Sequence, residues 1–208
     1  MEVVYRDEYI MVVNKPAGIA SQPAKMETPT ILDEMDKSFI PVNRLDQRVS
    51  GLMLLATEKN ISILSEALQQ RTIIKRYRAV VGNKPDAITA QVIHWLLKDA
   101  QHSKSKVFTK EVAHSKKAEL TYQLVQSSEK YHLLDIDLRT GRFHQIRAQL
   151  AAIGCPIVGD VKYGYKRTTP DGSIFLQSYS LTFPHPVSGQ ELHFEIDMPE
   201  LWKRYGFE

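Results

Sequence analysis

An uninterrupted apolar run, Leu52-Met53-Leu54-Leu55-Ala56, places the strongest constraint on how this chain can fold. Such a run is far shorter than the roughly 20 residues that a membrane-spanning helix needs. A short, continuous apolar run is typical of a strand that is buried on both faces. We therefore predict a central strand over residues 51–57, which begins at a glycine.

Further strands are predicted where β-branched and aromatic residues gather. These segments are 3–5, 9–13, 75–81, 118–125, 131–138, 174–183 and 191–196. Helices are predicted over residues 30–37, 58–70 and 144–153. The segment 98–115 has no clear period and is predicted to be a mobile loop or an irregular hairpin. Many strands with few, irregularly placed helices indicate the α+β class, with a mixed, largely antiparallel sheet flanked by helices and loops.

Length and composition limit the remaining possibilities. The 208 residues are 43% hydrophobic and 25% charged, which is typical of one large globular domain, predicted over residues 1–208. The N-terminus does not have the pattern of a signal peptide, and the single Cys155 can form neither an internal disulfide nor a cysteine-based zinc site. These features indicate a reducing, cytoplasmic location without membrane attachment.

The basic residues are unevenly distributed. Residues 98–117 contain six lysines and two acidic residues, so this segment alone has a charge of +4, whereas the whole chain has +3. Two shorter basic clusters lie within residues 71–78 and 139–147. Three basic clusters on a nearly neutral body point to a polyanion such as nucleic acid. The alternative is three solvated faces without a partner.

Three segments place polar side chains where chemistry could occur. Residues 43–51, with Arg44 and Asp46, precede the predicted central strand, although an isolated Arg-x-Asp is more often a surface ion pair. Residues 139–147 join a strand end to a helix start beside Arg142 and Arg147, an arrangement that can bind an anion.

The third segment is residues 75–81, where Tyr77 is predicted to point away from its basic neighbours. Such a tyrosine can stack on a base or simply pack in the core. Arg147 follows an apolar helix position, at the edge of the predicted buried face, and an arginine there usually meets a carboxylate. Asp46 is the partner that we predict.

Taken together and in this order, the segments resemble the RluA-type pseudouridine synthases. Residues 43–56, NRLDQRVSGLMLLA, are similar to the family's HRLDxxTSGLLLLA. The other matching segments are VVNKPAG at 12–18, KRY at 75–77, TGRFHQIR at 140–147, PIVGD at 156–160 with YG at 163–164, and PHP at 184–186. The resemblance thus covers nearly the whole chain.

The chain departs from the family pattern at two positions, Asn43 in place of histidine and Val49 in place of threonine. Because neither position is the nucleophile, we expect activity to survive. We also expect no S4 RNA-binding domain, since the catalytic motifs begin close to Met1. Substrate capture would then depend on the catalytic domain and its basic clusters.

The resemblance implies an isomerase that converts specific uridines of ribosomal or transfer RNA to pseudouridine without a metal or a cofactor. It implies Asp46 as the nucleophile, with Tyr77 and Arg147 as the other catalytic residues. The uridine must leave its stack before attack, and Arg44 is placed to fill the gap. The residues expected to bind RNA are Arg44, Lys104, Lys106, Lys110, Arg142 and His144.

Two other functions compete with this interpretation. One is an RNA-binding protein or chaperone on the same fold that lacks activity, although the retained catalytic residues argue against it. The other is a metal-dependent nuclease, which would need clustered carboxylates that the sequence does not offer. The target is expected to be a structured RNA such as a stem-loop, and the protein is expected to be a monomer. The sequence leaves open which uridine is modified, and whether Asp46 attacks the ribose or the base.

Overall fold

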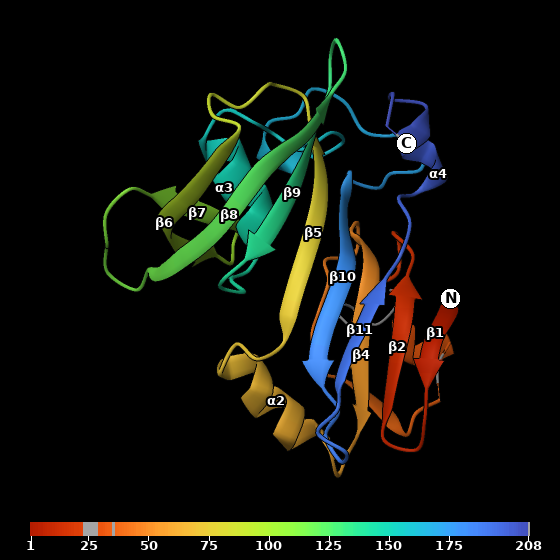
Figure 1. Cartoon of the computed structure of the whole chain (residues 1–208). Helices are drawn as coiled ribbons and strands as arrows, with labels where there is room; N and C mark the ends of the chain where they lie inside the picture. The colour runs from red at the N-terminus through yellow and green to blue at the C-terminus, as the bar shows by residue number, and fades with distance from the viewer. Residues whose placement is uncertain (23–28, 35, 208) are drawn as a thin grey trace. The chain divides into compact units, whose positions relative to one another are not determined.

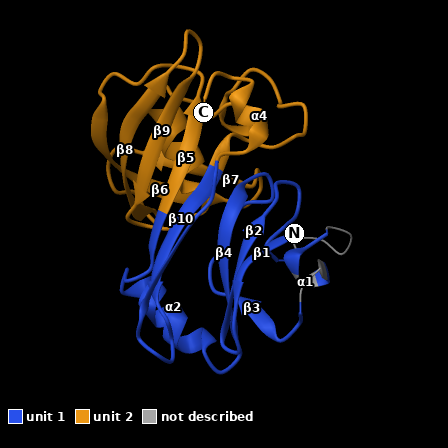
Figure 2. Ribbon diagram, turned by 45° about the vertical axis from the view of Figure 1, so that its right-hand side comes forward, with its two compact units in different colours: residues 1–75, 177–197 blue, residues 76–176, 198–208 orange. Residues whose placement is uncertain are grey.

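The structure, a computed structural model, describes residues 1–22, 29–34 and 36–207. The chain divides into two compact units (Figure 2). Unit 1 comprises residues 1–75 and 177–197, and unit 2 comprises residues 76–176 and 198–208. The single domain over residues 1–208 stays a prediction. No helix in the described part of the chain is long and apolar enough to cross a membrane.

Unit 1 is built on strands that were mostly predicted from the sequence (Figure 1). Its strands are β1 Glu2–Arg6, β2 Ile10–Lys15, β3 Phe39–Pro41, β4 Ser50–Thr57, β10 Leu176–Pro184 and β11 Glu191–Glu195. The strand order is β1-β2-β4-β10, with β3 also on β4 and β11 also on β10. Every one of these pairings is antiparallel except β4 with β10, which is parallel.

The core of unit 1 forms around β4, as the apolar run predicts. Leu52 and Leu54 are fully buried and belong to one cluster with Leu181 and Phe183 of β10. Helix α2, Ile61–Gln69, adds Leu64 to the same cluster. It is shorter than the predicted helix over residues 58–70.

Helix α1 of unit 1, Ile31–Glu34, covers only part of the helix predicted over residues 30–37. Residue 35 lies outside the described residues. The side chain of Asp33 accepts hydrogen bonds from the backbone N–H of Thr30, at 2.8 Å, and from its hydroxyl, at 2.9 Å. Local bonds of this kind satisfy a helix start without extending the helix.

Unit 2 contains a second set of antiparallel strands and the helix of the TGRFHQIR segment. Its strands follow the order β5-β9-β8-β6-β7. They are β5 Ile74–Val81, which starts in unit 1, β6 Thr89–Asp99, β7 Lys104–Phe108, β8 Lys116–Ser127 and β9 His132–Leu138. Helix α3, Gln145–Ala152, the 3-10 helix η1, Val161–Tyr163, and helix α4, Glu200–Lys203, complete the unit.

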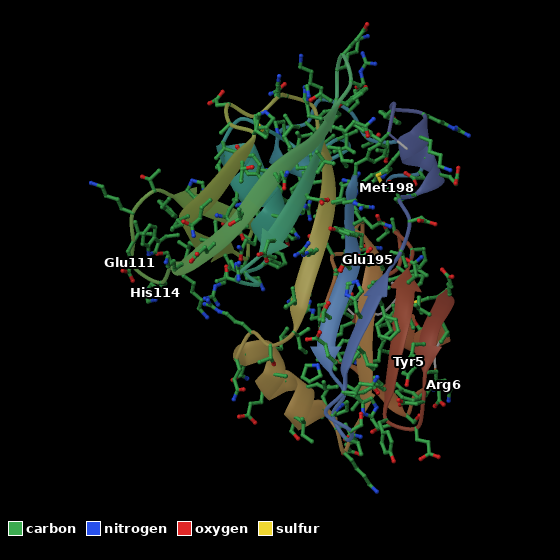
Figure 3. The ribbon with its side chains drawn as sticks, viewed as in Figure 1. Tyr5, Arg6, Glu111, His114, Glu195 and Met198 are labelled. Atoms are coloured by element: carbon green, nitrogen blue, oxygen red, sulfur yellow. The ribbon has the colours of Figure 1, made fainter. Side chains whose placement is uncertain are left out.

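The segment 98–115 forms the irregular hairpin that was one of its two predicted forms. Residues Leu97 and Lys98 at the end of β6 pair with Lys106 and Ser105 of β7. The loop that leads on to β8 contains Glu111 and His114 (Figure 3). Strand β6 was not predicted from the sequence. The structure adds this strand, Thr89–Asp99, to the sheet of unit 2.

Candidate active site

Asp46 lies on a short loop of unit 1 that is fixed just before β4. The side chain of Leu45 is buried, and its backbone N–H donates to the hydroxyl of Ser21 at 3.0 Å. The same hydroxyl donates to the carbonyl of Leu45 at 2.7 Å. Val49 closes a turn by donating its N–H to the carbonyl of Asp46. With Leu45 anchored in this way, Arg44 is exposed and Asp46 is half-buried beside it.

Asn43, which replaces the family's histidine, has a structural contact of its own. Its side-chain oxygen accepts the backbone N–H of Leu54 at 2.8 Å, so it ties the start of the loop to β4. Its side-chain nitrogen is buried and has no hydrogen-bond partner within the described residues. An amide can make the contact to Leu54 as well as a histidine, which supports the expectation that the replacement is tolerated.

A buried cation, Lys15, lies within electrostatic reach of Asp46. The ammonium group of Lys15 donates to the carbonyls of Pro16 and Ile19, both at 2.8 Å, and to that of Gln47 at 3.4 Å. Its side chain is fully buried, and this burial lowers its pKa from 10.5 to about 8, while the charge of Asp46 opposes the fall. Sequence reasoning missed this role, because a lysine at the end of a strand usually reaches into solvent.

Gly51 allows β4 to approach β10 at the point where the Asp46 loop ends. Its φ is +121°, and a Cβ atom there would come within 2.3 Å of the backbone oxygen of Ser178. Gly51 and Ser178 are register partners in the parallel pair. A side chain at position 51 would therefore displace the strand that holds the loop.

Tyr77 of unit 2 lies in β5 and points away from its basic neighbours, as predicted. It is buried and is the register partner of Ile136 in β9, whereas Arg76 is exposed. Arg78 is half-buried and contacts Asp135 at 3.4 Å. Strand alternation thus separates the ring from the charges.

Arg147 contacts a carboxylate, as predicted. The structure identifies Asp160 as a partner of Arg147, and the sequence had not indicated this residue. The Nε and Nη2 atoms of Arg147 donate to the two oxygens of Asp160 at 2.7 and 2.9 Å. The exposed fractions of the two side chains are 5% and 0%. A two-bond pair of this kind fixes the plane of the guanidinium. Arg147 therefore lies inside the unit rather than at the edge of a buried face.

The ring of Tyr163 connects Arg147 to His144. The guanidinium carbon of Arg147 lies 5.1 Å from the centre of this ring, and the Nδ1 atom of His144 lies 3.1 Å from the Tyr163 hydroxyl. The hydroxyl also accepts the backbone N–H of Ser105 at 2.7 Å. Asp160 belongs to the segment PIVGD and Tyr163 to the segment YG. Both segments were recognised as motifs in the sequence, but neither residue was assigned a role.

The other residues predicted to bind RNA have different surroundings. Arg142 is exposed, and its Nε donates to the backbone carbonyl of Lys117 at 3.0 Å. Lys106 pairs with Asp99 at 3.2 Å. Lys104 and Lys110 form no ion pair with the residues that the structure describes. Their charges are therefore less compensated than that of Lys106.

The predicted catalytic residues come from both units. Unit 1 brings Arg44 and Asp46 together on one loop, and unit 2 contains Tyr77 and Arg147. A pairing of Asp46 with Arg147 would involve one residue of each unit, and it stays a prediction.

Comparison with known proteins identifies the family. The sequence model of the family described as RNA pseudouridylate synthase matches residues 9–152. The ribosomal large subunit pseudouridine synthase C of Rickettsia felis is 31% identical over 206 residues, which cover 95% of this chain and 67% of the relative. An uncharacterized RNA pseudouridine synthase of Mycobacterium bovis is 32% identical over 220 residues, which cover 96% and 70% of the two chains.

Solved structures show the same fold. The human RNA pseudouridylate synthase domain-containing protein 4 has a TM-score of 0.81 at 20% identity, with 100% of this chain and 94% of that chain covered. The human domain-containing protein 1 has a TM-score of 0.79 at 19% identity, with 97% and 85% covered. The predicted fold class and the resemblance drawn from the sequence motifs are both confirmed. The chain belongs to the RNA pseudouridylate synthase family and is an RNA-modifying isomerase of that family.

Proposed function

We propose that this enzyme converts a specific uridine of a structured RNA to pseudouridine, with Asp46 as the nucleophile. Ribosomal RNA is the first candidate substrate, because the Rickettsia relative is named for the large ribosomal subunit. A transfer RNA stem-loop is the second. The enzyme would work as a monomer in the cytoplasm, and the lone, buried Cys155 suits a reducing compartment.

The placement of Asp46 is the observation that supports this proposal most directly. A carboxylate acts as a nucleophile only when it is ionised and accessible. Asp46 is half-buried on a loop that Ser21 and Leu45 fix, and the buried ammonium group of Lys15 lies near enough for the two charges to interact. The loop therefore offers an accessible carboxylate that can act as a nucleophile, beside a buried positive charge.

In the proposed reaction, the bond between the ribose C1′ and the ring N1 breaks, and a bond between C1′ and C5 forms. The hydrogen on C5 leaves as a proton, and N1 gains a proton, so the product is an isomer of the substrate. Asp46 adds covalently and leaves again, either at the ribose or at the base. Tyr77 would stack on the flipped base and accept or return a proton late in the reaction. Arg147 would provide positive charge to the site.

The target uridine has to leave its stack before it can react. Arg44 is exposed and directly precedes Leu45, the buried residue that anchors the loop before Asp46. Its long planar side chain could fill the vacated space and contact the neighbouring bases. The basic segment with Lys104 and Lys110 would hold the phosphates of the same RNA.

Release of tritium from RNA that contains 5-tritiated uridine tests the proposal. The wild-type enzyme is expected to release tritium from ribosomal or transfer RNA, and Asp46→Asn and Asp46→Ala are expected to release none above background while they still fold and bind RNA. Turnover by Asp46→Ala would sink the assignment of the nucleophile. Binding by the wild-type enzyme without any release would identify an RNA-binding protein without this activity.

The modified position can be found by mapping pseudouridine at single-nucleotide resolution in total RNA from a strain that lacks the gene. A position that disappears with the gene, and returns with the wild-type gene but not with Asp46→Asn, is the substrate.

A further inference from the structure

Phe143 presents an aromatic ring at a rigid point of unit 2, and the proposed mechanism gives this ring no role. The ring is half-buried and stacks on the imidazole of His144, with the ring centres 3.9 Å apart and the planes at 19°. The hydroxyl of Ser105 donates to the carbonyl of Phe143. His144 itself has a φ of +50°, a backbone conformation that residues other than glycine rarely adopt. It lies directly before the first residue of α3. The two stacked rings therefore form a fixed aromatic surface.

Two lysines of the β6–β7 hairpin border this surface. The ammonium group of Lys98 lies 4.9 Å from the centre of the Phe143 ring, and that of Lys104 lies 6.0 Å from the centre of the Tyr163 ring. Neither lysine forms an ion pair with any residue that the structure describes, whereas Lys106 on the same hairpin pairs with an aspartate. The charge at the rings is thus available to an anion.

The aromatic surface is next to the predicted catalytic arginine. The ring of Tyr163 packs against His144 with its plane at 79° and its centre 5.7 Å away. The same ring lies 5.1 Å from the guanidinium carbon of Arg147. A ligand on Phe143 would therefore be separated from Arg147 by two side chains.

We propose that Phe143 and His144, bordered by Lys98 and Lys104, form a stacking site for one unpaired RNA base adjacent to the target uridine. The face of an aromatic ring accepts any base, and a lysine beside it neutralises the neighbouring phosphate. Lys98 is exposed, and its ammonium group lies over the Phe143 ring. In the proposed complex the base takes this position over the ring, and the ammonium group of Lys98 contacts the phosphate of the same nucleotide instead. The proposal rests on the proposed function, since it places the base by reference to the catalytic residues.

Fluorescence anisotropy with a labelled oligouridine nine-mer tests the site. An oligomer of abasic ribose phosphates of the same length, which keeps the charges and lacks the bases, is the matched probe. Phe143→Ala is expected to weaken binding of oligouridine by about fivefold or more, the effect of losing one base stack, and to leave binding of the abasic probe unchanged. Phe143→Trp is expected to restore the affinity. Lys98→Gln should reduce the slope of log affinity against log salt by about 0.7 on both probes.

Lys130→Gln is the control for charge. Lys130 is exposed in the turn between β8 and β9, at the far end of β9 from Phe143, roughly 20 Å along the strand. It is expected to leave the affinity for both probes close to the wild-type value. An equal loss on both probes with Phe143→Ala, or no loss on either, would overturn the stacking site. If Phe143→Ala lowers the melting temperature, Phe143→Leu decides the matter, because leucine fills the space without stacking, and wild-type affinity in that variant would also overturn the site.

The tritium assay separates this proposal from the proposed function. Tritium release by the wild-type enzyme together with Phe143-independent binding would remove only the stacking site. Phe143-dependent binding without tritium release would remove the proposed function and leave an aromatic site for single-stranded RNA.

Discussion

Arg147 and Asp160 form a two-bond ion pair inside unit 2, with contacts of 2.7 and 2.9 Å and almost no exposure of either side chain. Such a pair fixes the guanidinium in one plane beside the ring of Tyr163. Removal of either partner would leave an uncompensated charge in the interior, which is among the most costly changes that a fold can suffer.

Arg147→Leu and Asp160→Asn are therefore each expected to lower the free energy of unfolding by roughly 3–5 kcal/mol, and Arg147→Leu is expected to abolish isomerisation as well. Urea unfolding at neutral pH and the tritium assay give the two readouts. Arg139→Leu is the matched control, because Arg139 pairs with Asp137 at 2.9 Å on the surface. Its loss should cost at most about 1 kcal/mol. Wild-type stability and rate in Arg147→Leu would show that the pair has no role.

Lys15 makes the stability of the enzyme depend on pH in the alkaline range. Its pKa is about 8 in the folded protein and 10.5 for an ordinary lysine, so between these values the unfolded chain binds a proton that the folded chain does not. Folding is then favoured as the pH rises, and the free energy of unfolding gains about 3 kcal/mol between pH 8 and pH 10.5 from this group. Urea unfolding as a function of pH measures this rise.

Lys15→Met should remove the rise, whereas Lys59→Met, at an exposed position, should keep it. Identical pH profiles for the wild type and Lys15→Met would mean that the pKa of Lys15 is not lowered in the folded protein.

Gly51→Ala is expected to prevent proper folding of unit 1. The new methyl group would lie within 2.3 Å of the backbone oxygen of Ser178, and backbone cannot move aside as a side chain can. We expect a loss of roughly 3 kcal/mol or more, measured by thermal unfolding of purified protein. Gly189→Ala shares the positive φ, at +71°, and meets nothing within 4 Å, so it isolates the backbone effect at about 1 kcal/mol. Similar losses in the two variants would disprove a specific close contact at Gly51.

The lysines of the β6–β7 hairpin and its following loop are expected to bind phosphates without choosing the target. Replacement of Lys104, Lys106 and Lys110 with glutamine should weaken RNA binding and flatten the salt dependence by about 0.9 per lost contact on duplex RNA. The modified position should stay the same. Because Lys106 already pairs with Asp99, Lys106→Gln alone should have the smallest effect of the three. A shift of the modified nucleotide would mean that the hairpin selects the uridine.

Much of the fold was predictable because local patterns and burial agree. The apolar run that predicted a strand over residues 51–57 is β4, Ser50–Thr57, and its six central residues are all buried. Strand β6 was missed because it lacks a regular alternation. Only Val92 and Leu96 are buried along its length. Buried and exposed side chains therefore do not alternate with the period of two that identifies a half-buried strand. Its place in the sheet comes from pairing with β7 and β8.

The candidate site was predictable as a set of residues but not as a set of contacts. The motifs named Asp46, Tyr77 and Arg147 as catalytic, and these assignments stay predictions. Asp160 could not be recognised as a partner of Arg147, because the pair depends on how the segment after α3 folds back. Lys15 was equally hidden, since its three carbonyl contacts come from two separate loops.

The two-part composition of unit 1 has a consequence for synthesis on the ribosome. Leu52 and Leu54 pack with Leu181 and Phe183, and more than a hundred residues separate the two pairs in the chain. The N-terminal strands therefore emerge long before β10 can cover them, and unit 1 cannot follow the usual order in which the first part of a chain folds first. During that delay the nascent chain displays an apolar strand surface, which is the kind of segment that chaperones bind.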